Sequence, residues 1–346
     1  MKINGRKLSD WLANMLVSAP EEWRVINNDY ILRKEISEVS RKIAYLAWEE
    51  NDNIYLKEAH CILEIIYNQD FSSARDLNTD SETQPILRDI AAILEKSMLD
   101  YEMRSVELSN IQEIPKDGKL YVKWLKRVIE NHKSNLHPFY NEFLAKHAKS
   151  EHIASYITQE STLDPRFDDI LAMMQIGLPT QQKIELANNY YDEMGNGKPE
   201  LVHSYLFKKA MVALGIDDNY IKENRLEAAL VCGNLSAALA ISRRHFYKAV
   251  GYYGVTEYMA PRRFKHVVNA WKRNNLPDVG IVYHDLHITI DAGHANGWFN
   301  NVVVPCINED PQIGIEIAQG ALMRLNSSER YLNQLYLNFN EELAGS

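Results

Sequence analysis

The sequence has few cysteines, no long apolar run and no excess of positive charge. It contains three cysteines and no CxxC pair, so neither a disulfide framework nor a thiolate metal site is expected. No run of about 18 apolar residues is present, and the N-terminal segment does not resemble a signal peptide. A net charge of −9 argues against a broad nucleic-acid or anionic-lipid surface. We therefore expect a cytoplasmic protein with reduced thiols that binds neither nucleic acid nor a membrane.

Helical periodicity dominates the chain, which predicts the all-α fold class. We expect an N-terminal helical subdomain over residues 1–135, for packing or dimerisation, and a second domain over residues 136–346. Polar segments at 70–83 and 110–118 predict loops, and Val302–Pro305 is β-prone but short. Helices are predicted over 37–50, 53–68, 84–107, 119–132, 137–148, 152–160, 167–177, 180–194, 200–214, 219–229, 234–249, 256–274 and 282–300, with one or two more within 310–343.

The segment from His284 to His294 is the most informative for chemistry. His287, Asp291 and His294 are spaced i, i+4, i+7, which places all three on one stripe of a helix. Two imidazoles and a carboxylate on one stripe suit a borderline divalent metal such as iron. A solvated helix face, or a single buried and hydrogen-bonded histidine, explains the same pattern without a metal.

One helix supplies only part of a metal's ligands, so further ligands are sought elsewhere. Glu193 and His203 flank a predicted helix break at Gly195–Pro199, which can turn both side chains toward one point. Glu257 stands among Tyr, Val, Met and Ala, where a carboxylate is costly to bury unless it is paired or coordinated. Glu160, near a helix end, is the weakest of the set. Each of these acids also has an ordinary explanation as a surface or helix-terminal residue.

Four carboxylates and three imidazoles are the donors of a diiron centre, in which carboxylates bridge the ions and reduce their repulsion. A competing pattern is the ferritin-like bundle, which uses two Glu-x-x-His motifs. Glu200-x-x-His203 and Asp291-x-x-His294 are both acid-x-x-His. However, the helix dipole alone explains Glu200 in a first helical turn, and His287 has no place in the ferritin-like scheme.

Taken together, these segments resemble the haem-oxygenase-like diiron oxidase and oxygenase family, whose members bind no haem. The similarity covers about residues 136–305 and is greatest with the N-oxygenating members. It implies a haem-oxygenase-like seven-helix bundle with an N-terminal helical extension, two iron ions, O2 as co-substrate and an external reductant. It also implies a homodimer formed through the extension. The metal ligands that it implies are Glu193, His203, Glu257, His287, Asp291 and His294, with Glu160 matched more loosely.

Other side chains invite different interpretations. Arg262 and Arg263 follow Glu257 and, with Tyr258, are candidates to bind a substrate carboxylate, although solvated arginines or core packing would explain them as well. Arg243-Arg244 in a helical segment could suggest DNA binding, which the acidic charge disfavours.

We therefore expect a non-haem diiron oxygenase that acts on a small amino-acid-like substrate, by N-oxygenation of an amine in a biosynthetic pathway. The same centre could instead catalyse desaturation or oxidative C–C cleavage of an amino or fatty acid. A second alternative is a non-catalytic helical interaction protein, which would bind no metal. The expected partners are the substrate, an electron donor and a second copy of the chain.

Overall fold

The structure is a computed structural model that describes residues 8–73, 84–106 and 114–345. Helices are the only regular secondary structure in these ranges, so the all-α prediction is confirmed. None of the described helices combines the length and apolar character that crossing a membrane would require. The chain forms two compact units that divide after Ser105.

The first unit is built on the long helix α3 (Tyr30–Trp48). This helix packs against α2 (Pro20–Asn28), α4 (Asn53–Asp70) and α5 (Pro85–Arg104), and α1 (Leu8–Leu16) packs against α4. The carboxylates of Asp29 and Asp52 accept hydrogen bonds from backbone N–H groups at the starts of α3 and α4. The four helices predicted for the first 135 residues are all present, and the loop at 70–83 lies largely outside the described residues.

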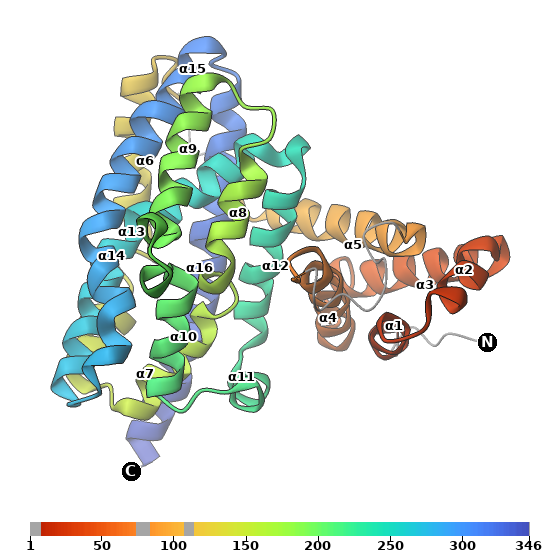
Figure 1. The fold of residues 1–346 in the computed structure, drawn as a ribbon, viewed down its shortest axis with the longest axis horizontal. Helices are drawn as coiled ribbons and strands as arrows, with labels where there is room; N and C mark the ends of the chain where they lie inside the picture. Colours follow the sequence, from red (N-terminus) through yellow and green to blue (C-terminus); the bar gives the residue numbers. More distant parts are fainter. Residues whose placement is uncertain (1–7, 74–83, 107–113, 346) are drawn as a thin grey trace. The chain divides into compact units, whose positions relative to one another are not determined.

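The second unit is a bundle around α13 (Phe246–Arg273), which packs against both α14 (Asp278–Gly297) and α16 (Ile313–Gly345). These three helices run side by side along the bundle in Figure 1. Helix α10 (His203–Ala213) packs against α14, and α12 (Glu227–Ile241) against α16 and α8 (Phe167–Met174). The remaining α-helices of the unit are α6 (Gly118–Asn131), α7 (Ser150–Glu160), α9 (Thr180–Glu193), α11 (Asp218–Asn224) and α15 (Val304–Glu309).

Helix α6 belongs to the second unit, because it packs on α15, α16 and the π-helical segment Trp298–Val303. The boundary between the two compact units therefore lies after Ser105, earlier in the chain than the predicted boundary at residue 135. The functional division after residue 135 stays a prediction. The β-prone segment Val302–Pro305 is helical, since it continues from the π-helical segment into α15.

Several predicted helix bounds between residues 200 and 274 are wrong. Helix α11 ends at Asn224, because the backbones of Arg225 and Leu226 are extended, so no single helix covers 219–229. Helix α12 instead passes through Gly233 without a break and ends at Ile241, which divides the predicted helix 234–249 between α12 and α13. Gly233 serves packing rather than termination, since a methyl group there would lie 2.8 Å from the Cβ atom of Thr162.

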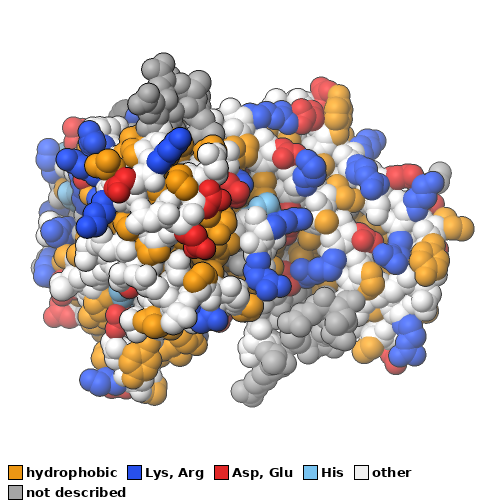
Figure 2. Space-filling model, turned by 90° about the horizontal axis from the view of Figure 1, so that it is seen from above, with side chains coloured by type: hydrophobic (Ala, Val, Ile, Leu, Met, Phe, Trp, Pro, Cys, Tyr) orange, Lys and Arg blue, Asp and Glu red, His pale blue; other side chains and the backbone are white. Residues whose placement is uncertain are grey.

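Positive and negative side chains are both present on the surface of the described residues. On the face shown in Figure 2, Lys and Arg side chains alternate with Asp and Glu rather than gathering into one broad patch. The expectation that the protein does not bind nucleic acid stays a prediction.

Two glycines allow α13 and α16 to touch through their backbones. A methyl group at Gly251 would lie 1.9 Å from the Ile317 carbonyl oxygen, and one at Gly320 would lie 1.8 Å from the Lys248 carbonyl oxygen. Both distances are far inside van der Waals contact, so any side chain would force the two helices apart. The close packing of α13 against α16 therefore depends on glycine at these two positions.

Gly251→Ala is expected to destabilise the protein by about 1–3 kcal/mol, because overpacking a helix contact displaces the backbone. Thermal unfolding followed by circular dichroism measures the loss as a lower Tm. The matched control is Gly293→Ala in α14, where an added methyl group meets no atom within 4 Å. That control should leave Tm unchanged or raise it, since alanine favours helix. Equal Tm values for Gly251→Ala and the parent protein would show that the helices are not in tight contact.

Candidate metal centre

Helix α14 carries three polar side chains into the interior of the second unit. His287, Asp291 and His294 are 3%, 4% and 6% exposed, so the predicted stripe faces the core and not solvent. The spacing of four and three residues explains their alignment, because such residues lie above one another on a helix. The solvated-face interpretation of this pattern is wrong.

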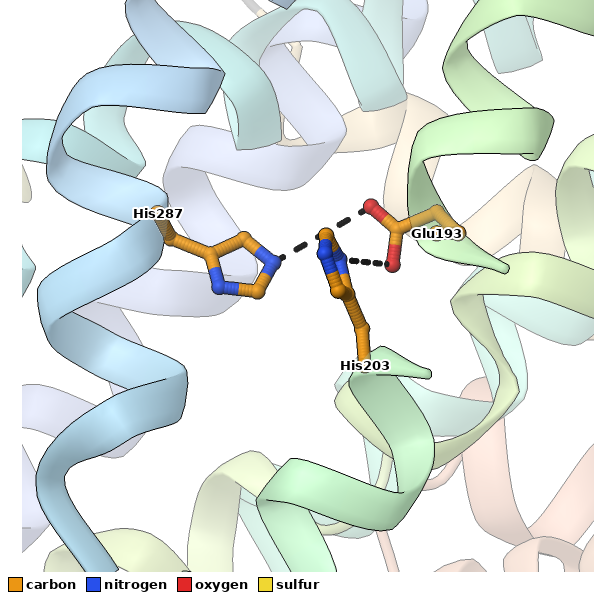
Figure 3. Close-up of side chains that lie close together, drawn as sticks. All are labelled: Glu193, His203 and His287. Carbon is orange, nitrogen blue, oxygen red and sulfur yellow. Dashed lines mark hydrogen bonds and ion pairs between the residues drawn. The ribbon is translucent and has the colours of Figure 1, made fainter. Parts of the chain in front are cut away.

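The first cluster joins His287 to Glu193 and His203 (Figure 3). Glu193 is the last residue of α9, and His203 is the first residue of α10. His203 Nδ1 lies 2.7 Å from Glu193 Oε2, and His287 Nε2 lies 4.0 Å from Glu193 Oε1. All three side chains are buried. We call this group the first triad.

The predicted helix break creates the first triad. Gly195, Asn196 and Gly197 all have positive φ angles, of 64°, 54° and 79°, which turn the chain sharply after α9. A methyl group at Gly195 would lie 2.6 Å from the Leu201 carbonyl carbon, so only glycine lets the returning chain come this close. A single turn of 3₁₀-helix at Pro199–Leu201 then leads into α10, which begins at His203 and not at residue 200.

The second cluster consists of Glu257 on α13 with Asp291 and His294 on α14. His294 Nδ1 lies 3.6 Å from Glu257 Oε2 and 3.7 Å from Asp291 Oδ1. Glu257 is 2% exposed, as its mostly apolar neighbours in the sequence predict. We call this group the second triad.

The two triads adjoin each other along α14. His287 and Asp291 are four residues apart, which is about 6 Å along a helix axis. Their charges interact: burial raises the pKa of Glu193, and the nearby Glu257 carboxylate raises it further. Burial likewise raises the pKa of Asp291 well above its usual value, with Glu257 and Glu193 adding to the effect. A nearby cation would stabilise the charged form of both carboxylates.

Three further groups orient the triads. The Tyr283 carbonyl oxygen accepts a hydrogen bond from His287 Nδ1 at 2.6 Å, which leaves Nε2 free to face Glu193. Asp192 Oδ2 accepts one from His294 Nε2 at 3.0 Å. Asn189 donates to Glu257 Oε1, also at 3.0 Å. Metal-binding histidines commonly hold their second ring nitrogen in this manner. These hydrogen bonds to the donors were not predicted from the sequence.

Among the six donors, His294 gives the clearest structural indication of a metal site. Its buried Nδ1 atom has no hydrogen-bond partner, although two carboxylates lie just beyond hydrogen-bonding distance. Burial lowers the pKa of His294, but Asp291 and Glu257 outweigh burial and raise the pKa to about 12. A positive charge is therefore strongly favoured at this point. A metal ion would supply that charge and occupy the unpartnered nitrogen.

The donor set fits iron. Three imidazoles and three carboxylates come from α9, α10, α13 and α14, and within each triad the donor atoms lie within 4.8 Å of one another. Mixed nitrogen and oxygen donors suit borderline divalent metals, and carboxylates can bridge two ions. The residues present are thus suited to hold two metal ions side by side.

Glu160 lies in neither triad. Its carboxylate accepts hydrogen bonds from Arg263 Nη1 at 3.0 Å and from the Tyr331 hydroxyl at 2.8 Å. Both of its oxygens are therefore engaged by other groups, an arrangement that does not favour the metal role predicted for it. That role stays a prediction.

The three residues predicted to bind substrate separate into two locations. Arg263 is 4% exposed and forms the buried ion pair with Glu160. Arg262 and Tyr258 line a hollow on the outside of the bundle, between α6, α13 and α14. The adjacent arginines thus point to different surroundings, because consecutive residues of a helix face different directions.

Comparison with known proteins gives a family. The model of a family described as iron-containing redox enzyme matches residues 154–329, which is just over half of the chain and includes both triads. No curated protein matches the chain. One similar solved structure is a domain of unknown function with a heme oxygenase-like fold from Shewanella denitrificans OS217. It is 16% identical, with a TM-score of 0.48, over 66% of this chain and 94% of that one. Likeness of that degree bears on neither activity nor ligands.

The family match and the geometry agree on the same part of the molecule. All six residues of the triads lie within the matched segment, on helices of the second unit. Buried imidazole and carboxylate donors are what an iron site in such a protein requires. The chain belongs to the family of iron-containing redox enzymes.

Proposed function

We propose that this protein is an O2-dependent non-haem diiron oxygenase that oxidises the amine of a small amino-acid-like molecule. The observation that carries the proposal is the pair of adjoining buried triads, which together provide six donors for two ions. Family membership supports iron as the metal. When bound, two iron ions supply the electron transfer to O2 that amino-acid side chains cannot perform.

The protein's own residues prepare the site. Burial of all six donors excludes bulk water, which strengthens the electrostatic attraction between carboxylates and a cation. Asp192 accepts the hydrogen bond from His294 Nε2, so that Nδ1 is the ring nitrogen that faces the second triad. The Tyr283 carbonyl oxygen does the same for His287 at the first triad. Both histidines are therefore oriented before a metal arrives.

A polar cluster near the first triad supports a polar substrate. The ring of Tyr283 lies 4.2 Å from that of His287, and its hydroxyl group interacts with Asp164. Around Asp164 are Glu160 and Arg263, all of them buried. Asp164 Oδ2 and Arg263 Nε have no hydrogen-bond partner. Burial and the nearby Glu160 carboxylate raise the pKa of Asp164 well above its usual value. A buried carboxyl group and a buried guanidinium, each with an unpartnered atom, suit a polar ligand that carries an amine and a carboxylate.

The proposed reaction requires a reductant. Inserting one oxygen atom of O2 into an N–H bond reduces the other atom to water, which consumes two electrons and two protons. An external electron donor must therefore serve the enzyme. The homodimer expected from the family resemblance stays a proposal alongside it.

Variants of the triads should bind less iron. His287→Ala, Glu257→Ala and His294→Ala each remove a donor, so each should lower the iron content after anaerobic loading with Fe(II), measured by plasma emission spectroscopy. Matched controls are His147→Ala and Asp285→Ala, which change exposed residues outside the triads. Iron content equal to that of the parent protein in all three triad variants would falsify the site.

Asp192→Asn tests orientation rather than ligation. The amide keeps the size of the side chain but removes the negative charge that fixes the His294 ring, so affinity for Fe(II) should fall by about 10–100-fold. Anaerobic competition against a chromophoric chelator measures this affinity. Asp285→Asn on the exposed face of α14 is the control and should bind iron as the parent protein does. An unchanged affinity in Asp192→Asn would mean that its contact with His294 plays no part in metal binding.

The product identifies the chemistry. The Fe(II)-loaded enzyme, exposed to ¹⁸O2 with a panel of amino acids and a chemical reductant, should yield a product with labelled oxygen on nitrogen, detected by mass spectrometry. A hydroxylamine, an oxime or a nitro compound is the expected class. A labelled or dehydrogenated product without an N–O bond would instead support desaturation or C–C cleavage at the same centre.

A further inference from the structure

A hollow of about 840 Å³ lies on the outside of the second unit, between α6, α13 and α14. Its volume falls within the range of about 300–1,000 Å³ that is common for small-molecule sites. Small residues of α14 leave the space open, among them Ala292 and Gly293, and a methyl group at Gly293 would meet no atom within 4 Å. We call this feature the outer groove.

The outer groove is positively charged. Lys126, Arg262 and Lys265 line it, against a single carboxylate from Glu130. That carboxylate is engaged, since it accepts a hydrogen bond of 2.5 Å from the Tyr258 hydroxyl group. Among the described residues, no carboxylate lies within ion-pair distance of Arg262 or Lys265. A local excess of unpaired cations departs from the chain's net charge of −9.

One of these cations is held in place. The Lys126 ammonium group lies 5.3 Å from the centre of the Tyr258 ring and 5.2 Å from that of Phe299, within the range of cation–π attraction. A lysine restrained by two rings loses less side-chain entropy when it binds an anion. The groove thus offers one restrained cation and two unpaired cations along its wall.

We propose that the outer groove binds a small molecule that carries phosphate or carboxylate groups. Three cations around a concave space match the charge of such a ligand, and arginine and lysine are the usual partners of both groups. The hollow has the volume of a small-molecule site, whereas a stable protein partner would bury about 800 Å² of this chain's surface. This site is separate from the triads, and it does not depend on the reaction proposed for them.

The location of the outer groove connects it to the second triad through the backbone. Tyr258 directly follows Glu257 on α13, and Ala292 and Gly293 stand between Asp291 and His294 on α14. The helices that carry the second triad on their buried faces thus form the groove with neighbouring residues. A bound ligand would rest on the same two helix segments that hold the metal donors.

The test uses the metal-free, full-length protein, so that failure of the proposed oxygenase would not affect it. Isothermal titration calorimetry with pyrophosphate and with citrate should show saturable binding of at least one of them, weakening as salt is added. Pyrophosphate alone would indicate a phosphate ligand, and citrate alone a carboxylate ligand. The double variant Arg262→Glu/Lys265→Glu should bind at least about tenfold more weakly, because two charge-assisted contacts are lost.

Two further variants distinguish the groove from general surface charge. Lys272→Glu changes an exposed lysine of α13 outside the groove and should bind the anion as the parent protein does. Gly293→Phe should abolish binding by filling the space while leaving Tm unchanged. The proposal is overturned if neither anion binds, or if the double variant binds like the parent protein. It is also overturned if polyglutamate binds and the small anions do not, since that would indicate an acidic protein partner.

Discussion

Three carboxylates and three imidazoles buried together in one helical bundle would be unfavourable without a cation. Each carboxylate loses its hydration, and the negative charges repel one another across short distances. The raised pKa values of Glu193 and Asp291 express this cost. Metal ions would remove it, so the free energy of metal binding also contributes to the stability of the folded bundle. The close contact of α13 and α16 supplies the rigid frame against which these groups are held.

The residues of the triads could be predicted because local sequence determines their position. His287, Asp291 and His294 follow helical spacing, and Glu193 and His203 stand on either side of a glycine-rich break. These signals are short in range, and they depend only on how a helix turns and where it must end. The apolar neighbours of Glu257 gave a weaker but correct indication that it is buried.

The partners of those residues could not be predicted, because they come from distant parts of the chain. Asp192 meets a histidine 102 residues later, and Glu160 pairs with an arginine 103 residues later. Nothing near Glu160 in the sequence distinguishes a metal ligand from a partner of Arg263. The role of Gly233 could not be predicted for a related reason, because its close contact is with Thr162 on another segment.

Helix α14 contributes donors to both triads: His287 to one, and Asp291 and His294 to the other. A shift of this helix along its axis would therefore disturb both ions together, and occupancy of one position would stiffen the other. The helices α9, α10 and α13 each serve a single triad. Sequence changes that alter one metal position independently should accordingly be found on those three helices. A change in the position of α14 would alter both metal positions, so the sequence of α14 should tolerate fewer substitutions.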